Sequence, residues 1–504
     1  MMSALPEIFF SKANDSASKR VLREAAAGRV RKLYAGIYTS NLTSPPEDIV
    51  RRNWLAIVGH LLPGGVVSHR SAVDGQPRDG QLVLTRGKTR RRVQLPGLTV
   101  DVIPGPGAIA DGDSTDMPYG SLFLSSEARR HLENQTRGRG WTDKVLASAE
   151  SDALLDRRLT LRGPHHLNLL RDAARALAPR LGLEKEYERL NGVVGALLGT
   201  HDTKRLHSRQ ALARAGGRPY DADRLPIFDA LFATLNQTTF ARLADPAPAG
   251  RTVENFAFFE SYFSNYIEGT TFTVEEAEDI VFRGKLIDHR HEDSHDILGT
   301  FDAALRAPWR NAVPGSADAF LAQLQTLNEL VMRSRPDKAP GQWKERRNQA
   351  GATFFVEPEL VRGTLMEGFD RIRALTDPVA RALLTMFVVT EVHPFADGNG
   401  RTSRLAMNAV LSAHQLCRII VPTVYRDDYL LPLKALTHQN QTGAYLRTMA
   451  RAQTWSAAFD YDVPRTDLHQ AMKRCNAFQE DRDRYKLLLP AEVPTAAVAG
   501  MQPP

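Results

Sequence analysis

Residues 393–404 read HPFADGNGRTSR in this 504-residue chain. Ahead of this stretch, Asp377-Pro378 supplies a helix cap and a helix-opening proline, and apolar residues at helical spacing follow as far as Val392. Pro394 cannot continue that helix and favours an extended backbone at His393. A second apolar helix is predicted from near residue 401 through 411. The stretch is therefore predicted to be a tight loop between two buried helices, and such support keeps functional groups rigid.

The loop combines four kinds of chemical group. Gly398-Asn399-Gly400 can turn successive backbone N–H groups toward an anion, at a helix N-terminus that itself favours negative charge. Arg401 and Arg404 are three residues apart, so both can lie on one helical face and close over a polyphosphate. Asp397 offers a hard oxygen ligand to Mg²⁺, and a neutral His393 can accept a hydroxyl proton. Together these groups predict nucleotidyl or phosphoryl transfer.

The same stretch resembles the HPFx[D/E]GN[G/K]RxxR motif of the Fic family and matches it at every defined position. The resemblance implies a protein adenylyltransferase, which transfers AMP from ATP to a Ser, Thr or Tyr hydroxyl of another protein or of itself. It implies that His393 is the general base and that Asp397 binds Mg²⁺. The ATP-binding residues would then be Asp397, Gly398, Asn399, Gly400, Arg401 and Arg404.

Two flanking segments extend this resemblance, which covers about residues 253–452. Residues 343–356 lie where Fic proteins carry a β-hairpin flap that aligns a target segment by strand addition. The flap would bring Thr353 and Phe354 to the nucleotide. Tyr429 resembles a tyrosine that lies near the nucleotide in the family, although a core position fits this residue equally well.

An upstream helix carries a second pattern, in which Ser264 and Glu268 are four residues apart and Gly269 suits the helix end. Many helices have Ser and Glu at this spacing, so the pattern alone predicts only a helix surface. Ahead of a Fic motif it resembles the [S/T]xxxE[G/N] inhibitory helix of the Fic subgroup that carries this element N-terminal to the core. The resemblance implies that Glu268 pairs with Arg404 and occupies the place that the γ-phosphate needs.

The excess positive charge lies at the N-terminal end, since residues 1–100 hold 16 lysines and arginines against 7 acidic residues and the whole chain has a net charge of +7. A nucleic-acid partner is therefore to be sought there. This region resembles the winged-helix region of AbiEi-type antitoxins, through residues 28–33, 36–38 and 68–72. The basic run 86–92 could hold phosphates by charge alone, and a solvated basic hairpin is equally consistent with it.

We expect a mainly α-helical protein, in which an all-helical Fic core with a small β-hairpin flap follows a small α+β winged-helix-like domain and a helical connector. The expected boundaries are 1–115 for the winged-helix-like domain, 116–245 for the connector, 251–455 for the Fic domain with its inhibitory helix, and 456–504 for an extension with a loose tail. More locally, we expect a helix over 17–27, one helix over 46–62 and a linker at 246–250. The histidines of 288–296 and 165–166 are expected in loops that bind no metal.

Composition fits a globular protein, with 42% hydrophobic and 24% charged residues. No apolar run could span a bilayer, no signal peptide is recognised, and two cysteines cannot form a disulfide framework, so a cytoplasmic location without a membrane partner is expected. Three alternatives to AMP transfer stay open: removal of AMP from a modified protein, transfer from another phosphate-containing donor, and a DNA-binding regulator or antitoxin whose core senses nucleotide. A homodimer also stays open.

Overall fold

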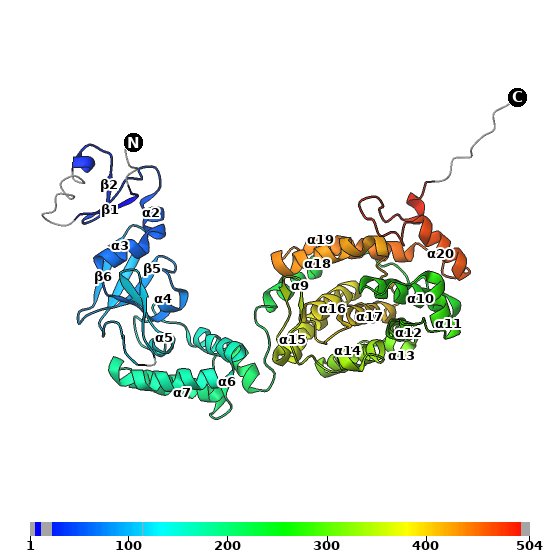
Figure 1. Ribbon diagram of the computed structural model, residues 1–504, viewed down its shortest axis with the longest axis horizontal. Helices are drawn as coiled ribbons and strands as arrows, with labels where there is room; N and C mark the ends of the chain where they lie inside the picture. The colour runs from blue at the N-terminus through cyan, green and yellow to red at the C-terminus, as the bar shows by residue number, and fades with distance from the viewer. Residues whose placement is uncertain (1–5, 12–22, 113, 495–504) are drawn as a thin grey trace. The chain divides into compact units, whose positions relative to one another are not determined.

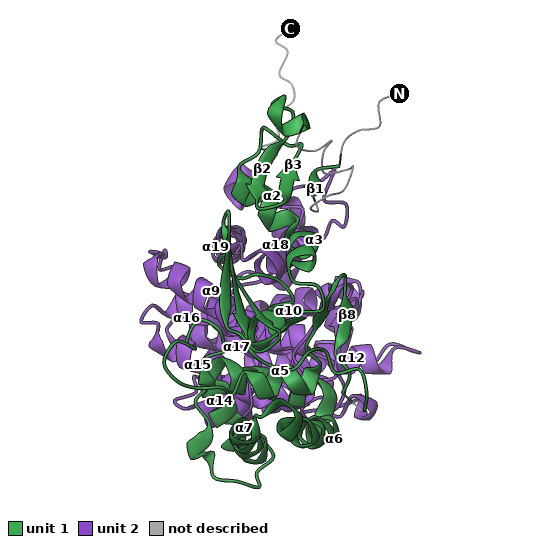
Figure 2. Ribbon diagram, turned by 90° about the vertical axis from the view of Figure 1, so that its left-hand side faces the viewer, with its two compact units in different colours: residues 1–217 green, residues 218–504 purple. Residues whose placement is uncertain are grey.

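The computed structural model describes residues 6–11, 23–112 and 114–494, and the chain divides into two compact units, residues 1–217 and 218–504 (Figure 2). Helices make up most of the second unit and of the later part of the first (Figure 1). The expectation of a mainly helical protein with a small β-rich N-terminal region is confirmed. No helix among the described residues is long and apolar enough to cross a membrane. Cys417 and Cys475 are both buried free thiols.

The first unit opens with two sheets and the short helices that pack on them. A three-stranded antiparallel sheet has the order β1-β3-β2, with bounds Ile8–Phe10, Ile37–Thr39 and Arg31–Tyr34. A mixed six-stranded sheet has the order β6-β7-β5-β4-β9-β8, with bounds Arg91–Leu95, Leu98–Ile103, Gln81–Thr85, Val66–Val67, Leu122–Leu124 and Met117–Tyr119. The helices are α2 (Pro46–Arg52), α3 (Trp54–Leu61) and α4 (His69–Asp74).

Of two local expectations for this region, the structure contradicts one and describes only part of the segment that the other concerns. The single helix expected over 46–62 is wrong, because Asn53 leaves helical geometry (φ −109°, ψ 13°) and separates α2 from α3. Both helices still bury apolar residues, among them Ile49 and Ile57, in a core shared with the sheets. Residues 12–22, which hold the first half of the helix expected over 17–27, lie outside the described residues, whereas 23–26 are helical.

The rest of the first unit is helical and has its own apolar core. Its elements are α5 (Glu127–Glu133), α6 (Ser148–Leu181), α7 (Glu184–Leu197), the 3₁₀ turn η1 (Thr203–Arg205) and α8 (Arg209–Ala215). Helix α6 kinks at Gly163, whose φ of 77° is left-handed, and Pro164 then begins its second half. His165 and His166 are therefore helical, and the loop expected for them is wrong.

The second unit is a bundle of helices around one large core. Figure 1 shows α16 (Pro378–Val392) and α17 (Asn399–Ala413) in the middle of this unit, and the two pack directly against each other. The surrounding helices are α9 (Leu225–Gln237), α10 (Gly250–Ile267), α11 (Val274–Arg283), α12 (His291–Leu305), α13 (Ala307–Arg310), α14 (Ala317–Met332), α15 (Val361–Ala374), α18 (Arg426–Gln439), α19 (Thr442–Ala457) and α20 (Arg465–Arg474).

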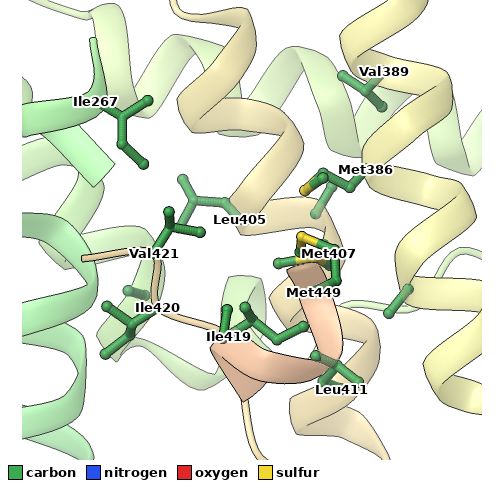
Figure 3. Packing of buried hydrophobic residues seen from close by; sticks show 14 of the residues in the cluster. Ile267, Met386, Val389, Leu405, Met407, Leu411, Ile419, Ile420, Val421 and Met449 are labelled. Atoms are coloured by element: carbon green, nitrogen blue, oxygen red, sulfur yellow. The ribbon is translucent and has the colours of Figure 1, made fainter. Parts of the chain in front are cut away.

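Apolar side chains from distant parts of the sequence hold α16 and α17 in place. Met386 of α16, Leu405 of α17, Ile267 of α10 and Ile420 belong to one cluster of buried side chains (Figure 3). Each of these four side chains is at most 5% exposed. Burying a side chain of this size contributes roughly 1.5–3 kcal/mol. The loop between the two helices is therefore mounted on a rigid base.

The division between the units lies at residues 217 and 218, earlier in the chain than the boundary expected near 245. Helix α9, expected in the connector, places Phe228 and Leu235 in the core of the second unit. The linker expected at 246–250 is wrong, because Ala247 is 1% exposed and belongs to that core. The Pro- and Ala-rich composition therefore reflects a packed crossing between α9 and α10.

Candidate active site

The loop of residues 393–398 joins the two central helices and begins with His393. Its backbone is left-handed, with φ 53° and ψ 61°, so the extended conformation expected before Pro394 is wrong. The His393 N–H donates to the carbonyl of Val389 at 3.0 Å, which closes the last turn of α16. This helix-capping hydrogen bond outweighs the local preference that the proline imposes.

The same loop is cross-braced by its own side chains. The Asn399 amide accepts a hydrogen bond from the Phe395 N–H at 2.8 Å and donates one to the Phe395 carbonyl at 2.9 Å. Asn328 of α14 donates to the carbonyl of Asp397 at 2.9 Å. Gly398 has a φ of 75° and begins α17, a conformation that favours glycine. The loop is thus held in one geometry before any ligand binds.

The His393 ring is positioned so that one nitrogen stays free to act as a base. Its Nδ1 lies 3.3 Å from the carbonyl of Thr390, which can only accept a hydrogen bond, so Nδ1 carries the proton and Nε2 keeps its lone pair. The ring stacks on Phe355, with centroids 3.9 Å apart and an interplanar angle of 10°. Burial lowers the pKa of His393 to about 4. The imidazole is therefore neutral at pH 7.

The expected hairpin at residues 343–356 is present, as β10 (Gln349–Ala350) paired antiparallel with β11 (Thr353–Phe354). The two flap residues expected at the nucleotide have the following surroundings. Thr353 Oγ lies 2.8 Å from Nε2 of His438 on α18, and Phe354 is 47% exposed. Phe355, which the sequence analysis did not single out, is the flap residue that reaches His393.

Lys344 ties the base of the flap to the residues on both sides of His393. Its side chain is buried, and its Nζ donates to the Asn348 side chain at 2.7 Å and to the Val392 carbonyl at 3.3 Å. Its backbone N–H donates to the Pro394 carbonyl at 2.9 Å. Burial lowers the pKa of Lys344 to about 7. Sequence reasoning missed it, because a lysine followed by Glu-Arg-Arg is typical of a solvated surface.

A second tether runs from the start of α9 to the flap. Arg224 pairs with Glu391, a buried residue near the end of α16, and also donates to the Phe354 carbonyl at 2.5 Å. Thr437 of α18 donates to the same carboxylate at 2.6 Å. The flap is thus connected to α16 through a charged network that no short motif indicates.

Glu268 and Arg404 form the ion pair that the sequence predicted, with Glu268 Oε1 2.7 Å from an Arg404 Nη. Ser264 holds the same guanidinium, accepting from Nε through Oγ at 3.0 Å and from Nη through its carbonyl at 2.9 Å. The Glu268 carboxylate lies directly over Gly400, so close that a Cβ at Gly400 would collide with Oε1. It therefore occupies the first turn of α17, where the sequence predicts the anion site.

The charge state of Glu268 follows from its neighbours. Burial alone would raise the pKa of Glu268, but the Arg404 guanidinium, helped by Arg401 and His393, holds it below its ordinary value. The carboxylate is therefore ionised at neutral pH, and it neutralises the cation that would otherwise receive a phosphate. Arg404 itself is 5% exposed, so this pair is better shielded than an ordinary surface ion pair.

Arg401 has different partners from Arg404. It donates to Asp296 of α12 at 2.6 Å and to Asn265 of α10 at 3.1 Å, and it lies 4.0 Å from Asp397. Asp296 also binds Arg335 at 3.0 Å. Arg401 is thus tied to a buried carboxylate network, and the structure does not bring it together with Arg404 as a shared clamp.

The loop expected at residues 288–296 is wrong for residues 291–296, which are helical. Helix α12 begins at His291, and Asp296 is 1% exposed because two arginines satisfy its carboxylate. The described residues contain no group of three or more His, Cys, Asp or Glu side chains that could hold a metal ion.

Asp397 and Tyr429 complete the set of predicted site residues. The Asp397 side chain is 45% exposed, and its Oδ1 accepts from the Gly398 N–H at 2.6 Å. One half-exposed, oriented carboxylate fits a Mg²⁺ ion that takes its other ligands from phosphates and water. Tyr429 is 1% exposed, with its ring 6.0 Å from the Arg404 guanidinium carbon. It is a core residue behind the arginine.

Comparison with known proteins places the site in a described family of domains. Residues 319–411 match the sequence model of the Fic/DOC family. The chain is 27% identical over 201 residues to protein adenylyltransferase fic-1 of Caenorhabditis briggsae, covering 38% of this chain and 39% of that protein. It is 29% identical over 209 residues to protein adenylyltransferase Fic of Drosophila yakuba, covering 40% and 41%.

Among solved structures, the chain is similar to Fic-1 of C. elegans, with 20% identity, a TM-score of 0.34, and coverage of 66% of this chain and 96% of that one. It is also similar to a Fic-domain-containing signaling protein of Bacteroides thetaiotaomicron, with 19% identity, a TM-score of 0.35, and coverage of 46% and 95%. The chain spans about two fifths of the length of the two curated relatives. It contains a Fic/DOC domain with homology to the Fic-type protein adenylyltransferases.

Proposed function

We propose that this Fic/DOC domain transfers AMP from ATP to a hydroxyl side chain of a protein, and that Glu268 holds the reaction off. One observation carries the proposal: the ionised Glu268 carboxylate lies on the first turn of α17 and is bound to Arg404. A negative group is thus already accommodated where the helix N-terminus favours an anion. The names of the curated relatives support the same activity.

The residues around this turn would bind the triphosphate. The N–H groups of Gly398-Asn399-Gly400 and the N-terminus of α17 offer donors to phosphate oxygens. Arg404, once released by Glu268, would bind the γ-phosphate, and Ser264 would keep the guanidinium in place meanwhile. Asp397 would hold Mg²⁺, which neutralises charge on the phosphates when bound.

His393 would accept the proton of the incoming hydroxyl. Its free Nε2 takes that proton while the hydroxyl oxygen forms a bond to the α-phosphorus. The bond from the α-phosphorus to the bridging oxygen breaks, and pyrophosphate leaves with the electron pair. The stack on Phe355 and the hydrogen bond to Thr390 keep the ring in one orientation during this transfer. The flap edge would align the target segment.

Glu268 would hold the reaction off by changing the way in which ATP binds. With Glu268 in place, the γ-phosphate meets a carboxylate where it needs a cation, so ATP can bind only with its α-phosphate out of line.

A second candidate function rests on the same carboxylate. Because Glu268 is ionised and within electrostatic range of His393, it could orient a water toward an AMP-modified side chain and remove the AMP.

The first unit supports a separate proposal, nucleic-acid contact by an AbiEi-like winged-helix-like region. Its basic run at residues 86–92 is exposed along nearly all of its length. The two free thiols support a reducing, cytoplasmic compartment.

The experiment that tests the proposed function compares full-length wild type with Glu268→Gly. Each is incubated with ATP, Mg²⁺ and cell lysate, and modified peptides are identified by mass spectrometry, with His393→Ala as the inactive control. AMP on Ser, Thr or Tyr residues, more abundant with Glu268→Gly and missing with His393→Ala, is expected. AMP that disappears from pre-modified proteins with wild type would favour the removal reaction.

A further inference from the structure

A cleft of about 400 Å³ opens in the first unit, and none of the residues that line it has been assigned a role above. It lies between the chain that follows α5, the start of α6, helix α7 and the turn η1. The cleft is distinctive for its basic lining, and the side chains that form it are Gln135, Arg137, Ser148, Asp152, Arg189, Val193, Lys204, Arg205 and His207.

Two of its arginines are held in place by hydrogen bonds, Arg137 by neutral groups and Arg189 by one carbonyl and by the Glu186 carboxylate. Arg137 donates to the carbonyls of Asn134 and Thr136 at 2.7 and 2.9 Å and to the Ser148 hydroxyl at 3.2 Å. Arg189 donates to the Gln135 carbonyl at 3.0 Å. Carbonyl and hydroxyl partners orient a guanidinium without neutralising it. Arg137 is thus oriented without being neutralised by these partners, whereas the charge of Arg189 is partly offset by Glu186.

The side chains that line the cleft carry more positive than negative charge, although Glu186 and Asp202 pair with Arg189 and Lys204 from outside the lining. Asp152 is the single acidic lining residue against four lysines and arginines. Its carboxylate already accepts from the backbone N–H groups of His207 and Ser208, at 2.5 and 3.4 Å. Glu186 binds Arg189 at 3.0 Å from outside the lining. Burial lowers the pKa of Arg137, and the proximity of Arg189 lowers it further.

A glycine in the wall of the cleft leaves room for another cationic side chain, that of Arg205. Arg205 lies across Gly192 of α7, where a Cβ would come within 2.5 Å of the Arg205 Cδ. Any larger residue at Gly192 would displace the arginine. Lys204, beside it, is 89% exposed and pairs with Asp202 at 3.3 Å, a surface ion pair weak enough for the lysine to turn toward a ligand.

We propose that this cleft binds a phosphate group, carried either by a small phosphorylated molecule or by a nucleic-acid backbone. Guanidinium forks match phosphate oxygens in a bidentate manner, and two forks held side by side are pre-organised for that contact. The described lining holds no Phe, Tyr or Trp ring, and His207 is its one aromatic side chain, so recognition would rest mainly on the phosphate. This site is independent of the proposed AMP transfer and of the basic run at residues 86–92.

The test measures pyrophosphate binding to the full-length chain by calorimetry without Mg²⁺, in an Arg404→Ala background that weakens anion binding by the Fic/DOC domain. The double variant Arg137→Gln/Arg189→Gln is expected to weaken binding at least about tenfold, since it removes two charged contacts. Arg175→Gln, which removes one exposed arginine of α6 in the same unit, is the control for loss of a surface charge outside the cleft and should leave binding unchanged.

A second pair of variants guards against loss of folding. Ser148→Glu places a carboxylate beside Arg137 at the first position of α6, where a negative residue suits the helix N-terminus. It should abolish binding without lowering the melting temperature, whereas Ser148→Gln should still bind. Unchanged affinity in Ser148→Glu, equal losses in Ser148→Gln or Arg175→Gln, or no binding to the parent at millimolar pyrophosphate would each overturn the proposal.

A duplex-DNA arm distinguishes the two sources of phosphate. Fluorescence anisotropy with a labelled duplex is measured on the same variants. If Ser148→Glu weakens duplex binding and pyrophosphate competes with the duplex, the phosphate belongs to nucleic acid. If duplex binding is missing or insensitive to Ser148→Glu while pyrophosphate binding is lost, the ligand is a small phosphorylated molecule.

Discussion

Glu268→Gly is expected to raise AMP transfer by more than an order of magnitude, because the carboxylate is the group that neutralises Arg404. The substitution removes the 2.7 Å contact but leaves both hydrogen bonds from Arg404 to Ser264. The guanidinium therefore stays in position and becomes available to the γ-phosphate. Gly269, whose φ is 95°, already ends the helix at this point, so a glycine at 268 should not unfold α10.

The size of the effect follows from the ion pair. A hydrogen bond between charged groups contributes about 1.5–3 kcal/mol, which corresponds to a roughly 10- to 150-fold change in an equilibrium constant. The Glu268 side chain is 31% exposed, and solvent weakens the pair. We therefore expect the lower part of that range, a gain in rate of about 10- to 40-fold. The affinity for ATP should change less, since the remaining phosphate contacts are unaltered.

The assay measures initial rates of self-modification and target modification at saturating ATP, together with ATP affinity by calorimetry. Glu268→Gln should give an intermediate rate, because the amide is neutral but still fills the space over Gly400. Glu268→Gly/Arg404→Ala should stay slow, because the second substitution removes the contact between Arg404 and the γ-phosphate. Glu329→Gln, an exposed carboxylate on α14, is the control and should match wild type.

One result would refute this reasoning. If Glu268→Gly binds ATP yet transfers AMP no faster than wild type, the ion pair does not restrain the reaction. Glu268 would then be a structural cap of α10.

His393→Ala should abolish transfer while ATP affinity stays within a few-fold of wild type, because the imidazole acts on the hydroxyl proton. If the variant turns over at a rate comparable to wild type at saturating ATP, His393 is not the base. In Glu268→Gly, kcat/KM should stay level as the pH falls through about 6.5, the ordinary imidazole pKa, because burial lowers the pKa of His393 to about 4 and the ring stays neutral. An acid limb centred near the ordinary value would contradict the burial. The full-length protein should bind duplex DNA with steep salt dependence and little sequence preference, given its exposed basic run; a gel shift that is negative even at low salt would exclude that contact.

The central part of the site could be predicted from the sequence because its signals are local. The apolar periodicity on either side of residues 393–404 indicated two buried helices, and the structure has α16 and α17 there. The Asp377 cap is also present, accepting from the Val379 and Ala380 N–H groups at 2.8 and 3.0 Å. The pairing of Glu268 with Arg404 joins residues 136 apart, and only the family resemblance made it predictable.

Other parts of the site depend on contacts that no short pattern encodes. Arg401 carries the same charge as Arg404 and lies one turn away, yet it pairs with Asp296, 105 residues upstream. Lys344 looks like a surface lysine in the sequence and is buried because a carbonyl and an amide satisfy its ammonium. The left-handed backbone of His393 reflects a helix cap that competes with the following proline.

The boundary between the units is another feature that no short sequence pattern encodes. Pro, Ala and Gly at residues 246–250 have the composition of a linker, but Ala247 packs into the core of the second unit. Helix α9 joins that core through its apolar face, and Arg224 at its start reaches Glu391. Composition cannot distinguish a free linker from a short crossing that one buried residue anchors to the core, because small residues suit both.

The fate of the α-phosphate tests the central claim most directly. Glu268→Gly, in parallel with Glu268→Gly/His393→Ala, is incubated with ATP labelled at either the α- or the γ-phosphate, and protein-bound label is measured. Transfer of AMP predicts that only the α-label is retained on protein, and that the loss of His393 removes it. Label retained from the γ-position, or none from the α-position although ATP binds, would contradict AMP transfer by this domain.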